Sequence, residues 1–248
     1  MRFDLITLFP ELFAAFLSSG VTRRAYESGL VLVKLWNPRD FAEGAYRRVD
    51  DRPFGGGPGM VMMAEPLARC LAGIRAERGD KAPVLLFSPV GQTLAHAQVE
   101  HWAASPGAVL ICGRYEGIDQ RFIDTHVDQQ ISLGDFVLSG GEIAAMALLD
   151  AVARLQPGVL GDEGSHAQDS FNPVLDGLLD CPHYTRPEDW DGQKVPDVLM
   201  SGHHAQIERW RREQRLALTQ RQRPELIAAA RLAGRLYAAD ELYLRSLL

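Results

Sequence analysis

Short continuous apolar runs alternate along the first part of the chain with segments of helical periodicity. The runs predict strands covered on both faces, because such strands are apolar throughout. They lie at 2–9, 30–36, 82–88, 108–113 and the start of 129–141. The predicted helices lie at 10–17, 67–78, 93–104 and 142–155. Pro89 and Gly91 are expected to end the third strand. The alternation predicts an α/β fold with a parallel sheet.

The pattern changes after Pro157. Residues 161–177 are polar and rich in Gly, Pro and Asp, and beyond them we expect helices at 205–222 and 224–248 but no strand. We therefore predict three parts: an α/β domain at 1–160, a flexible linker at 161–172 and a small all-helical domain at 173–248.

Composition narrows the class of protein. The chain has 248 residues, 46% of them hydrophobic, with 26 basic and 32 acidic residues and a net charge of −6. A disordered chain is excluded because it would be less apolar and more highly charged. Three cysteines without a paired spacing exclude a disulfide scaffold and indicate no zinc site. With no signal peptide and no run of eighteen apolar residues, we predict a cytoplasmic protein without a membrane span.

Three predicted strands end in residues that suit a ligand pocket. These ends are Ser88-Pro89, Gly113 and Gly140-Gly141. In parallel sheets ligands bind beyond the carboxyl ends of the strands, so we expect the three ends to converge. Ser139 to Glu142 also fits a capping box at a helix start. Both interpretations of that segment remain open, and the glycines would allow close backbone approach to a ligand.

Other motifs are less specific. The glycine-rich segment 54–60 lacks the spacing of a nucleotide phosphate loop, so it is a surface loop or, with neighbouring arginines, an anion-contacting one. The segment from His203 to Pro224 contains six arginines but only two glutamates. This excess of positive charge favours a phosphate-contacting helix over a merely solvated one. Cys181 and His183 lack further ligands at zinc spacing. Spacing alone makes Asp169 a solvated loop residue and Arg154 the partner of Asp150.

Eight strings occur in the order expected of one family. They are VDDRPFGGGPGM (49–60), FSPVG (87–91), ICGRYEGID (111–119), SLGDFVLSGGE (132–142), DAVARLQPGVLG (150–161), DSF (169–171), DGLLDCPHYTRP (176–187) and SGHHAQIERWR (201–211). The chain closely resembles the bacterial tRNA (guanine-N1)-methyltransferases, which belong to the SPOUT class. The resemblance extends from the first strand to the basic helix.

The resemblance implies a parallel-sheet SPOUT domain with a deep C-terminal trefoil knot, a helical tRNA-binding domain and a homodimer with a composite active site. It also implies S-adenosylmethionine as cofactor, held by the loops around 87–91, 111–119 and 132–141. The matching positions are Phe87, Ser88, Pro89, Gly113, Tyr115, Glu116, Gly117, Leu133, Gly134, Asp135, Phe136, Val137, Leu138, Gly140 and Gly141.

The implied reaction is methylation of N1 of guanosine 37 in a tRNA with guanosine at position 36. By resemblance, Asp169 is the general base and Arg154 stabilises charge on the guanine. The implied substrate-binding residues are Asp50, Gly59, Ser165, Asp180, Arg209 and Arg211. Magnesium is a further candidate cofactor, although the sequence shows no metal-ligand set. The chain departs from the common family pattern at Tyr46, Val90 and Ala144.

Two other functions remain open from the sequence. One is a SPOUT methyltransferase with a different RNA target, against which the DSF segment and the arginine-rich helix argue. The other is an RNA-binding module without activity, which would need the basic helix but not SLGDFVLSGGE.

Overall fold

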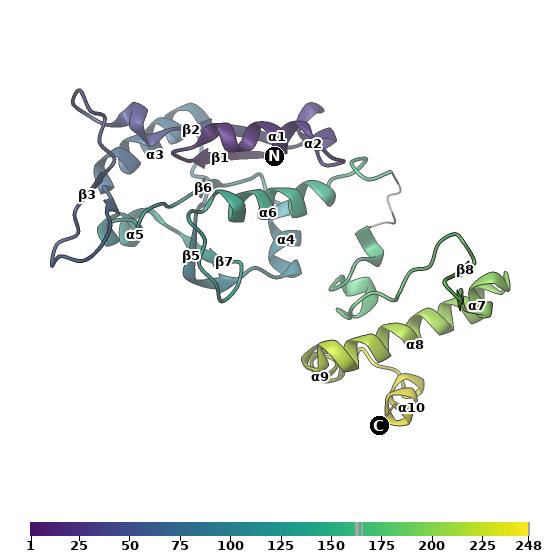
Figure 1. Cartoon of the computed structure of the whole chain (residues 1–248). Helices are drawn as coiled ribbons and strands as arrows, with labels where there is room; N and C mark the ends of the chain where they lie inside the picture. The colour runs from purple at the N-terminus through teal and green to yellow at the C-terminus, as the bar shows by residue number, and fades with distance from the viewer. Residues whose placement is uncertain (162–163, 165, 248) are drawn as a thin grey trace. The chain divides into compact units, whose positions relative to one another are not determined.

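A computed structural model of the chain describes residues 1–161, 164 and 166–247 (Figure 1). The chain divides into two units, unit 1 from Met1 to Gly161 and unit 2 from Asp162 to Leu248. No helix among the described residues combines the length and apolar character that a bilayer crossing requires.

Unit 1 is built on a sheet of five parallel strands in the order β2-β1-β6-β5-β7. The strands are β1 (Arg2–Ile6), β2 (Leu32–Trp36), β5 (Val84–Thr93), β6 (Val109–Ile111) and β7 (Gln129–Ser132). The helices are α1 (Phe13–Ser18), α2 (Arg23–Glu27), α3 (Ala64–Arg78), α4 (His96–Ala103), α5 (Gln120–His126) and α6 (Glu142–Arg154). The predicted α/β class with a parallel sheet is confirmed.

The sheet has a hydrophobic core on each face. Successive residues of a strand contribute to opposite cores, because their side chains point to opposite faces of the sheet. Leu5 and Leu110 pack with residues of α1, α2, α4 and α6 on one face. Ile6 and Ile111 pack with residues of α3 and α5 on the other. Helices therefore cover both faces, as the apolar runs predicted (Figure 1).

The third strand does not end at Pro89. β5 continues to Thr93, and its pairing with β7 shifts register between Phe87 and Gln92. The chain arches out through Pro89 and then returns to the sheet edge. Gly91 permits this return, because a Cβ there would lie 2.4 Å from the backbone carbon of Gln130. The sequence prediction was wrong because the shift of register absorbs the proline that would interrupt a regular strand.

The sequence also missed smaller elements. Helices α2 and α5 are short. β3 (Asp50–Asp51) pairs antiparallel with β4 (Val61–Met62), and the two strands flank the predicted loop 54–60. A 3₁₀ turn at Pro10–Leu12 precedes α1, and another spans Pro38–Phe41. Short helices carry too few turns for their apolar period to be recognised in the sequence.

Unit 2 is mainly helical. Its elements are α7 (Asp197–Met200), α8 (His204–Gln222), α9 (Pro224–Leu232) and α10 (Ala238–Ser246), with 3₁₀ turns at His166–Gln168 and Pro173–Leu175. Two predictions are corrected. A two-stranded ladder joins β8 (Asp189–Trp190) to β9 (Gln193–Lys194), so strands do occur there. The helix predicted at 224–248 is interrupted near Gly234, whose φ of +68° ends α9.

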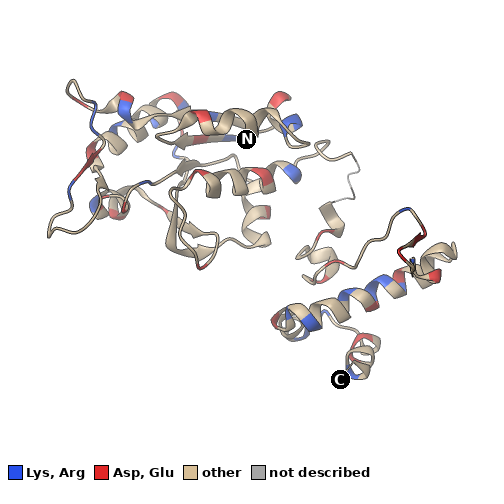
Figure 2. Cartoon of the chain, in the orientation of Figure 1, with Lys and Arg blue, Asp and Glu red and all other residues tan. Residues whose placement is uncertain are grey.

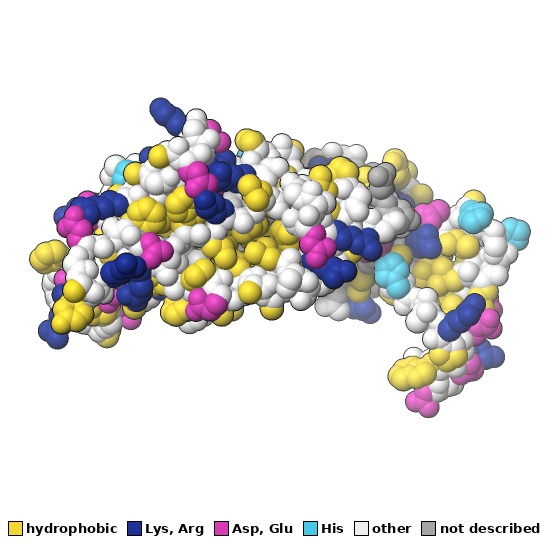
Figure 3. All heavy atoms as spheres, turned by 90° about the horizontal axis from the view of Figure 1, so that it is seen from above, with side chains coloured by type: hydrophobic (Ala, Val, Ile, Leu, Met, Phe, Trp, Pro, Cys, Tyr) yellow, Lys and Arg dark blue, Asp and Glu magenta, His cyan; other side chains and the backbone are white. Residues whose placement is uncertain are grey.

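The surface of unit 1 carries apolar as well as charged groups. On the side where α1 and α2 lie, hydrophobic side chains gather between charged ones (Figure 3). Exposed apolar residues near the N-terminus are Phe9, Leu12, Val21, Leu30 and Leu32.

Candidate functional site

A cavity of about 440 Å³ opens at the arch within β5 and beyond the carboxyl ends of β6 and β7. Its walls are the arch after Phe87, the loop after Gly113 and the loop from Leu133 to Gly141. The convergence expected from the three strand ends is therefore confirmed.

Thirteen of the fifteen residues predicted to bind cofactor line this cavity. They are Phe87, Ser88, Pro89, Gly113, Tyr115, Glu116, Gly117, Leu133, Phe136, Val137, Leu138, Gly140 and Gly141. The other two, Gly134 and Asp135, lie in the same loop but are not among the lining residues. Ala144 and Val90, where the sequence departs from the family pattern, also line the cavity.

Close backbone packing sets the distance between two cavity walls. The Gly141 amide donates a hydrogen bond of 3.0 Å to the carbonyl oxygen of Gly113. A Cβ at Gly141 would lie 2.8 Å from the Cα of Cys112, so no larger residue fits without a shift. Tyr115 has a φ of +61°, a strained value for a residue with a side chain. Strain of this kind persists only where the surrounding structure enforces it.

The β3–β4 hairpin abuts the same cavity. The Glu116 amide donates to the Met60 carbonyl oxygen at 3.0 Å. A Cβ on Gly59 would lie 2.5 Å from the Glu116 side chain. Burial raises the pKa of the Tyr115 phenol, and the neighbouring Asp50 carboxylate raises it further. Asp50 and Gly59, predicted to contact substrate, thus lie against Tyr115 and Glu116, two of the residues predicted to bind cofactor.

The two predicted catalytic residues belong to different units. Arg154 is the last residue of α6 in unit 1 and is half-buried. Asp169 follows the 3₁₀ turn at His166–Gln168 in unit 2 and is also half-buried. The Asn172 side chain fixes this turn by donating to the His166 carbonyl oxygen at 3.0 Å. Ser165 lies outside the described residues.

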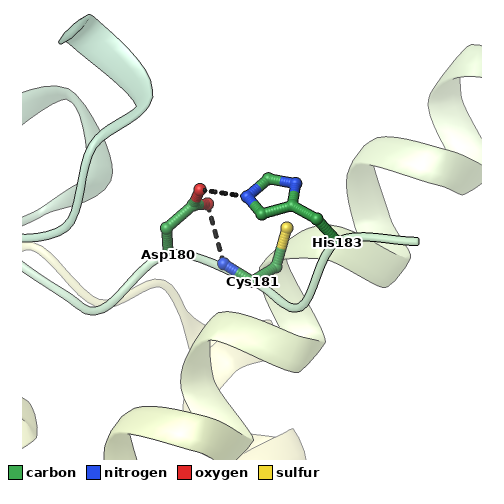
Figure 4. Close-up of side chains that lie close together, drawn as sticks. All are labelled: Asp180, Cys181 and His183. Atoms are coloured by element: carbon green, nitrogen blue, oxygen red, sulfur yellow. Dashed lines mark hydrogen bonds and ion pairs between the residues drawn. The ribbon is translucent and has the colours of Figure 1, made fainter. Parts of the chain in front are cut away.

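Asp180 forms a compact cluster with Cys181 and His183 (Figure 4). Its carboxylate accepts a hydrogen bond from the Cys181 amide at 2.7 Å and lies 2.9 Å from His183 Nε2. Arg215 Nε lies 3.5 Å away. Burial alone raises the pKa of the Asp180 carboxyl, but these partners outweigh burial and lower it below its usual value.

Asp180 is a third potential metal ligand beside Cys181 and His183, and the spacing of residues in the sequence did not indicate it. The three ligand atoms lie within 4.8 Å of one another, close enough to share an ion. However, the carboxylate already has cationic and N–H partners, and Arg215 would repel a second cation. Burial also raises the pKa of the Cys181 thiol, which opposes the thiolate that a metal needs. The cluster is therefore satisfied without a metal ion.

The basic helix is less basic than its sequence indicated. Arg212 and Arg215 are directed into unit 2, where they pair with Asp240, Asp176 and Asp180. Arg209 is exposed and pairs with Glu213 at 2.9 Å, and the half-buried Arg211 pairs with Glu208 at 2.8 Å. Figure 2 shows basic residues along α8. Two of the six arginines thus hold the unit together instead of facing solvent.

The capping prediction for Ser139 to Glu142 is wrong. Gly141 is the N-cap of α6, and no side-chain cap bond forms there. The buried Glu142 carboxylate instead pairs with Arg114. No local pattern predicts this pairing, because it joins residues 28 positions apart.

Comparison with known proteins decides the family. The model of the tRNA (guanine-1)-methyltransferase (TrmD) family matches residues 1–229. The chain belongs to this family. A tRNA (guanine-N(1)-)-methyltransferase of Polaromonas sp. (strain JS666) is 78% identical, covering 100% of this chain and 97% of that protein. Those of Albidiferax ferrireducens and Bordetella pertussis are 77% and 58% identical, covering 99% and 100% of this chain and 99% and 98% of theirs. The resemblance seen in the eight strings is thus confirmed.

Proposed function

We propose that this protein transfers a methyl group from S-adenosylmethionine to N1 of guanosine 37 in tRNA, with guanosine at position 36. Membership of the tRNA (guanine-1)-methyltransferase family supports the reaction class. The observation that carries the proposal is the cavity, because most of the predicted cofactor residues line it.

The cavity fits the proposed methyl donor. Its volume of about 440 Å³ lies within the range of small-molecule sites. Gly113, Gly117 and Gly140 line the cavity, and glycines let an adenine or a ribose approach the backbone closely. Leu133, Phe136 and Leu138 of one loop would exclude water from the reacting methyl group. The donor supplies an electrophilic sulfonium methyl, so the protein's task is to prepare the acceptor nitrogen.

Guanine N1 carries a proton that must leave as the new N–C bond forms. In the proposed mechanism the Asp169 carboxylate accepts this proton. Negative charge then develops toward guanine O6, and the Arg154 guanidinium stabilises it. A general base typically contributes about 10²–10⁴-fold to rate, which sets the effect expected on its removal.

We also propose that the active site is composite, with Asp169 of one chain serving the cavity of a second copy. Exposed apolar side chains support a homodimer through this region, since they lie in the cavity loops and at the start of α6. They are Val90, Phe136, Val137 and Ile143, all more than half exposed in the single chain. Covering such surface is favourable in water.

The proposed trefoil knot concerns the path after β7. β7 lies at the sheet edge next to β5, and β6 lies on the other side of β5. The Gly141 amide nevertheless bonds to Gly113, directly after β6. The segment 133–141 must therefore cross β5 near the arch around Pro89. This crossing supports threading of the chain through the arch.

On the substrate side, we propose that Asp50 and Gly59 line the target base and that Asp180, Arg209, Arg211 and Ser165 contact tRNA. Unit 2 would then be the tRNA-binding domain, and the division at 1–160, 161–172 and 173–248 stays a prediction. Among the described residues, the one group of three or more candidate metal ligands is the Asp180 cluster. Magnesium therefore remains a prediction from the resemblance, as does a cytoplasmic location.

The test is transfer of labelled methyl from S-adenosylmethionine to tRNA transcripts with guanosine at 36 and 37. The matched control carries adenosine at 36. We expect label on N1 of guanosine 37 in the first transcript and little in the control. Equal labelling would refute the sequence preference, and no labelling would refute the activity. Labelling of another RNA alone would favour the alternative, a SPOUT methyltransferase with a different target.

A further inference from the structure

An ion pair of Arg114 and Glu142 lies where two walls of the cavity meet, and Arg114 itself lines the cavity. Arg114 Nε lies 2.9 Å from Glu142 Oε2, and the Glu142 side chain is 1% exposed. Thr7 donates a hydrogen bond of 2.9 Å to the other carboxylate oxygen. The cluster thus joins the ends of β1 and β6 to the start of α6.

The rest of the Arg114 side chain is held as well. Its Nη1 donates to the Ser139 carbonyl oxygen at 3.3 Å. Its guanidinium carbon lies 4.5 Å from the centre of the Phe9 ring, a cation–π contact. Arg114 therefore belongs to one cavity wall and bonds to the other.

Gly140 lies directly against this side chain. A Cβ there would be 2.2 Å from Arg114 Nε and 2.5 Å from Cδ. The φ of Gly140 is not in the left-handed region, so its conformation does not require glycine. The requirement comes from Arg114, which cannot move aside while Glu142 and Phe9 hold it.

We propose that Arg114 and Glu142 are positioning residues that set the separation of the loops 113–117 and 138–141 around the methyl donor. The inference rests on the proposed function of the cavity. Glu142 opens α6, where the helix dipole favours a negative charge. The fixed carboxylate holds the guanidinium, and the guanidinium holds Ser139 and excludes any side chain at Gly140. Donor affinity depends on this spacing, because a preformed site loses less freedom on binding.

The first test uses the double variant Arg114→Ala/Glu142→Gln, which removes both charges and leaves no buried carboxylate unpaired. Hydrogen–deuterium exchange reports the Gly141 amide, and titration with S-adenosylhomocysteine reports affinity. We expect the Gly141 amide to exchange about tenfold faster or more, and affinity to fall about tenfold. The amides of Leu148 and Leu149 in α6 should be unchanged. Unchanged protection of Gly141 would overturn the inference.

The second test separates steric positioning from direct ligand contact. Gly140→Ala should reduce affinity at least tenfold in the natural chain but less than about threefold in the double variant, because the clashing side chain is gone. An equal loss in both backgrounds would mean that the ligand itself requires Gly140, and the inference would be wrong.

A milder variant protects the test against misfolding. Thr7→Val nearly preserves volume and removes two hydrogen bonds, the one that the Thr7 hydroxyl donates to Glu142 and the one that it accepts from the Phe9 amide. It should speed Gly141 exchange and weaken affinity in the same direction by a smaller factor, while an unchanged Gly141 amide would contradict the inference. The proposed function is judged separately, from methyl transfer by the natural chain. If that chain is active and these variants behave as the natural chain does, the positioning role alone fails.

Discussion

The two units of the chain bury charge in different settings. In unit 1, Asp4 is buried in β1 between cores of 20 and 14 buried residues, where Arg78 lies 2.7 Å from it. In the described part of unit 2 the core has five buried residues, and Arg212 links Asp176 and Asp240 across it at 2.9 and 2.7 Å. The strained Tyr115 beside the cavity belongs to unit 1, the unit with the larger cores. Unit 2 depends more on ion pairs, so pH and substitution should affect it more.

The largest expected effect concerns catalysis. Asp169→Asn should reduce the rate of methyl transfer about 10²–10⁴-fold, because the amide cannot accept the N1 proton. S-adenosylhomocysteine affinity should stay unchanged, since the donor cavity lies in unit 1. Single-turnover methylation and titration calorimetry measure the two. Asp191→Asn, an exposed carboxylate in the same unit, is the control and should be fully active. A parallel loss of donor affinity would break the division of roles between the units.

The next effect concerns stability. Arg212→Met should destabilise unit 2 by about 3–5 kcal/mol, because it leaves Asp240 buried without its cation. Hydrogen exchange of amides in α9 and α10 would report the loss, while those of α6 should not change. Arg209→Met is the matched control on the same helix. Its pair with Glu213 is exposed, so it should cost less than about 1 kcal/mol.

Lowering the pH should also affect the stability of the two units differently, with a smaller effect than the substitution. Burial raises the pKa of the Asp240 carboxyl, but the hydrogen bonds from Arg212 and from the Tyr237 amide lower it by more. The net pKa is below the usual value. A carboxyl whose pKa is lowered by folding stabilises the folded state at pH values above its pKa in the unfolded chain, about 4. That stabilisation is lost as the pH falls through its pKa in the folded protein. Unit 1 loses the same kind of contribution from Asp4, whose pKa is also lowered by its arginine partners, but it keeps its two larger cores. Unit 2, with the smaller core, should therefore unfold before unit 1 as pH falls below about 4. Arg212→Met should flatten this dependence, and an unaltered pH profile would contradict the assignment.

The smallest effect concerns tRNA. Removing Arg209 and Arg211 together should weaken tRNA binding and reduce the slope of log Kd against log salt by about 1 per arginine. Arg235→Ala, an exposed arginine outside α8, is a control that should leave the slope nearly unchanged. Equal slopes for the natural chain and the double variant would remove these arginines from the interface.

The sequence predicted what depends on local pattern and failed where distant segments decide. The parallel sheet followed from apolar runs, and the cavity followed from strand ends that a sheet brings together. The continuation of β5 past Pro89 depends on pairing with β7, 39 residues later in the chain, which no local rule shows. Glu142 fits a capping pattern, but Thr7 and Arg114 occupy its carboxylate. The sequence also could not show that Arg212 and Arg215 form ion pairs inside unit 2, because their aspartate partners lie far away along the chain.

The central claim is that one chain's cavity works with another chain's Asp169, and mixed dimers test it most directly. One parent is Asp169→Ala. The other is Gly113→Val, whose Cβ would meet Ile118 and Leu86 at ordinary contact distances of 3.5 and 3.8 Å while filling the donor cavity. Each variant alone should be inactive. After subunit exchange at equal amounts, about a quarter of the natural activity should return, because half the dimers are mixed and each has one intact composite site. Activity no higher than that of either parent would contradict the account.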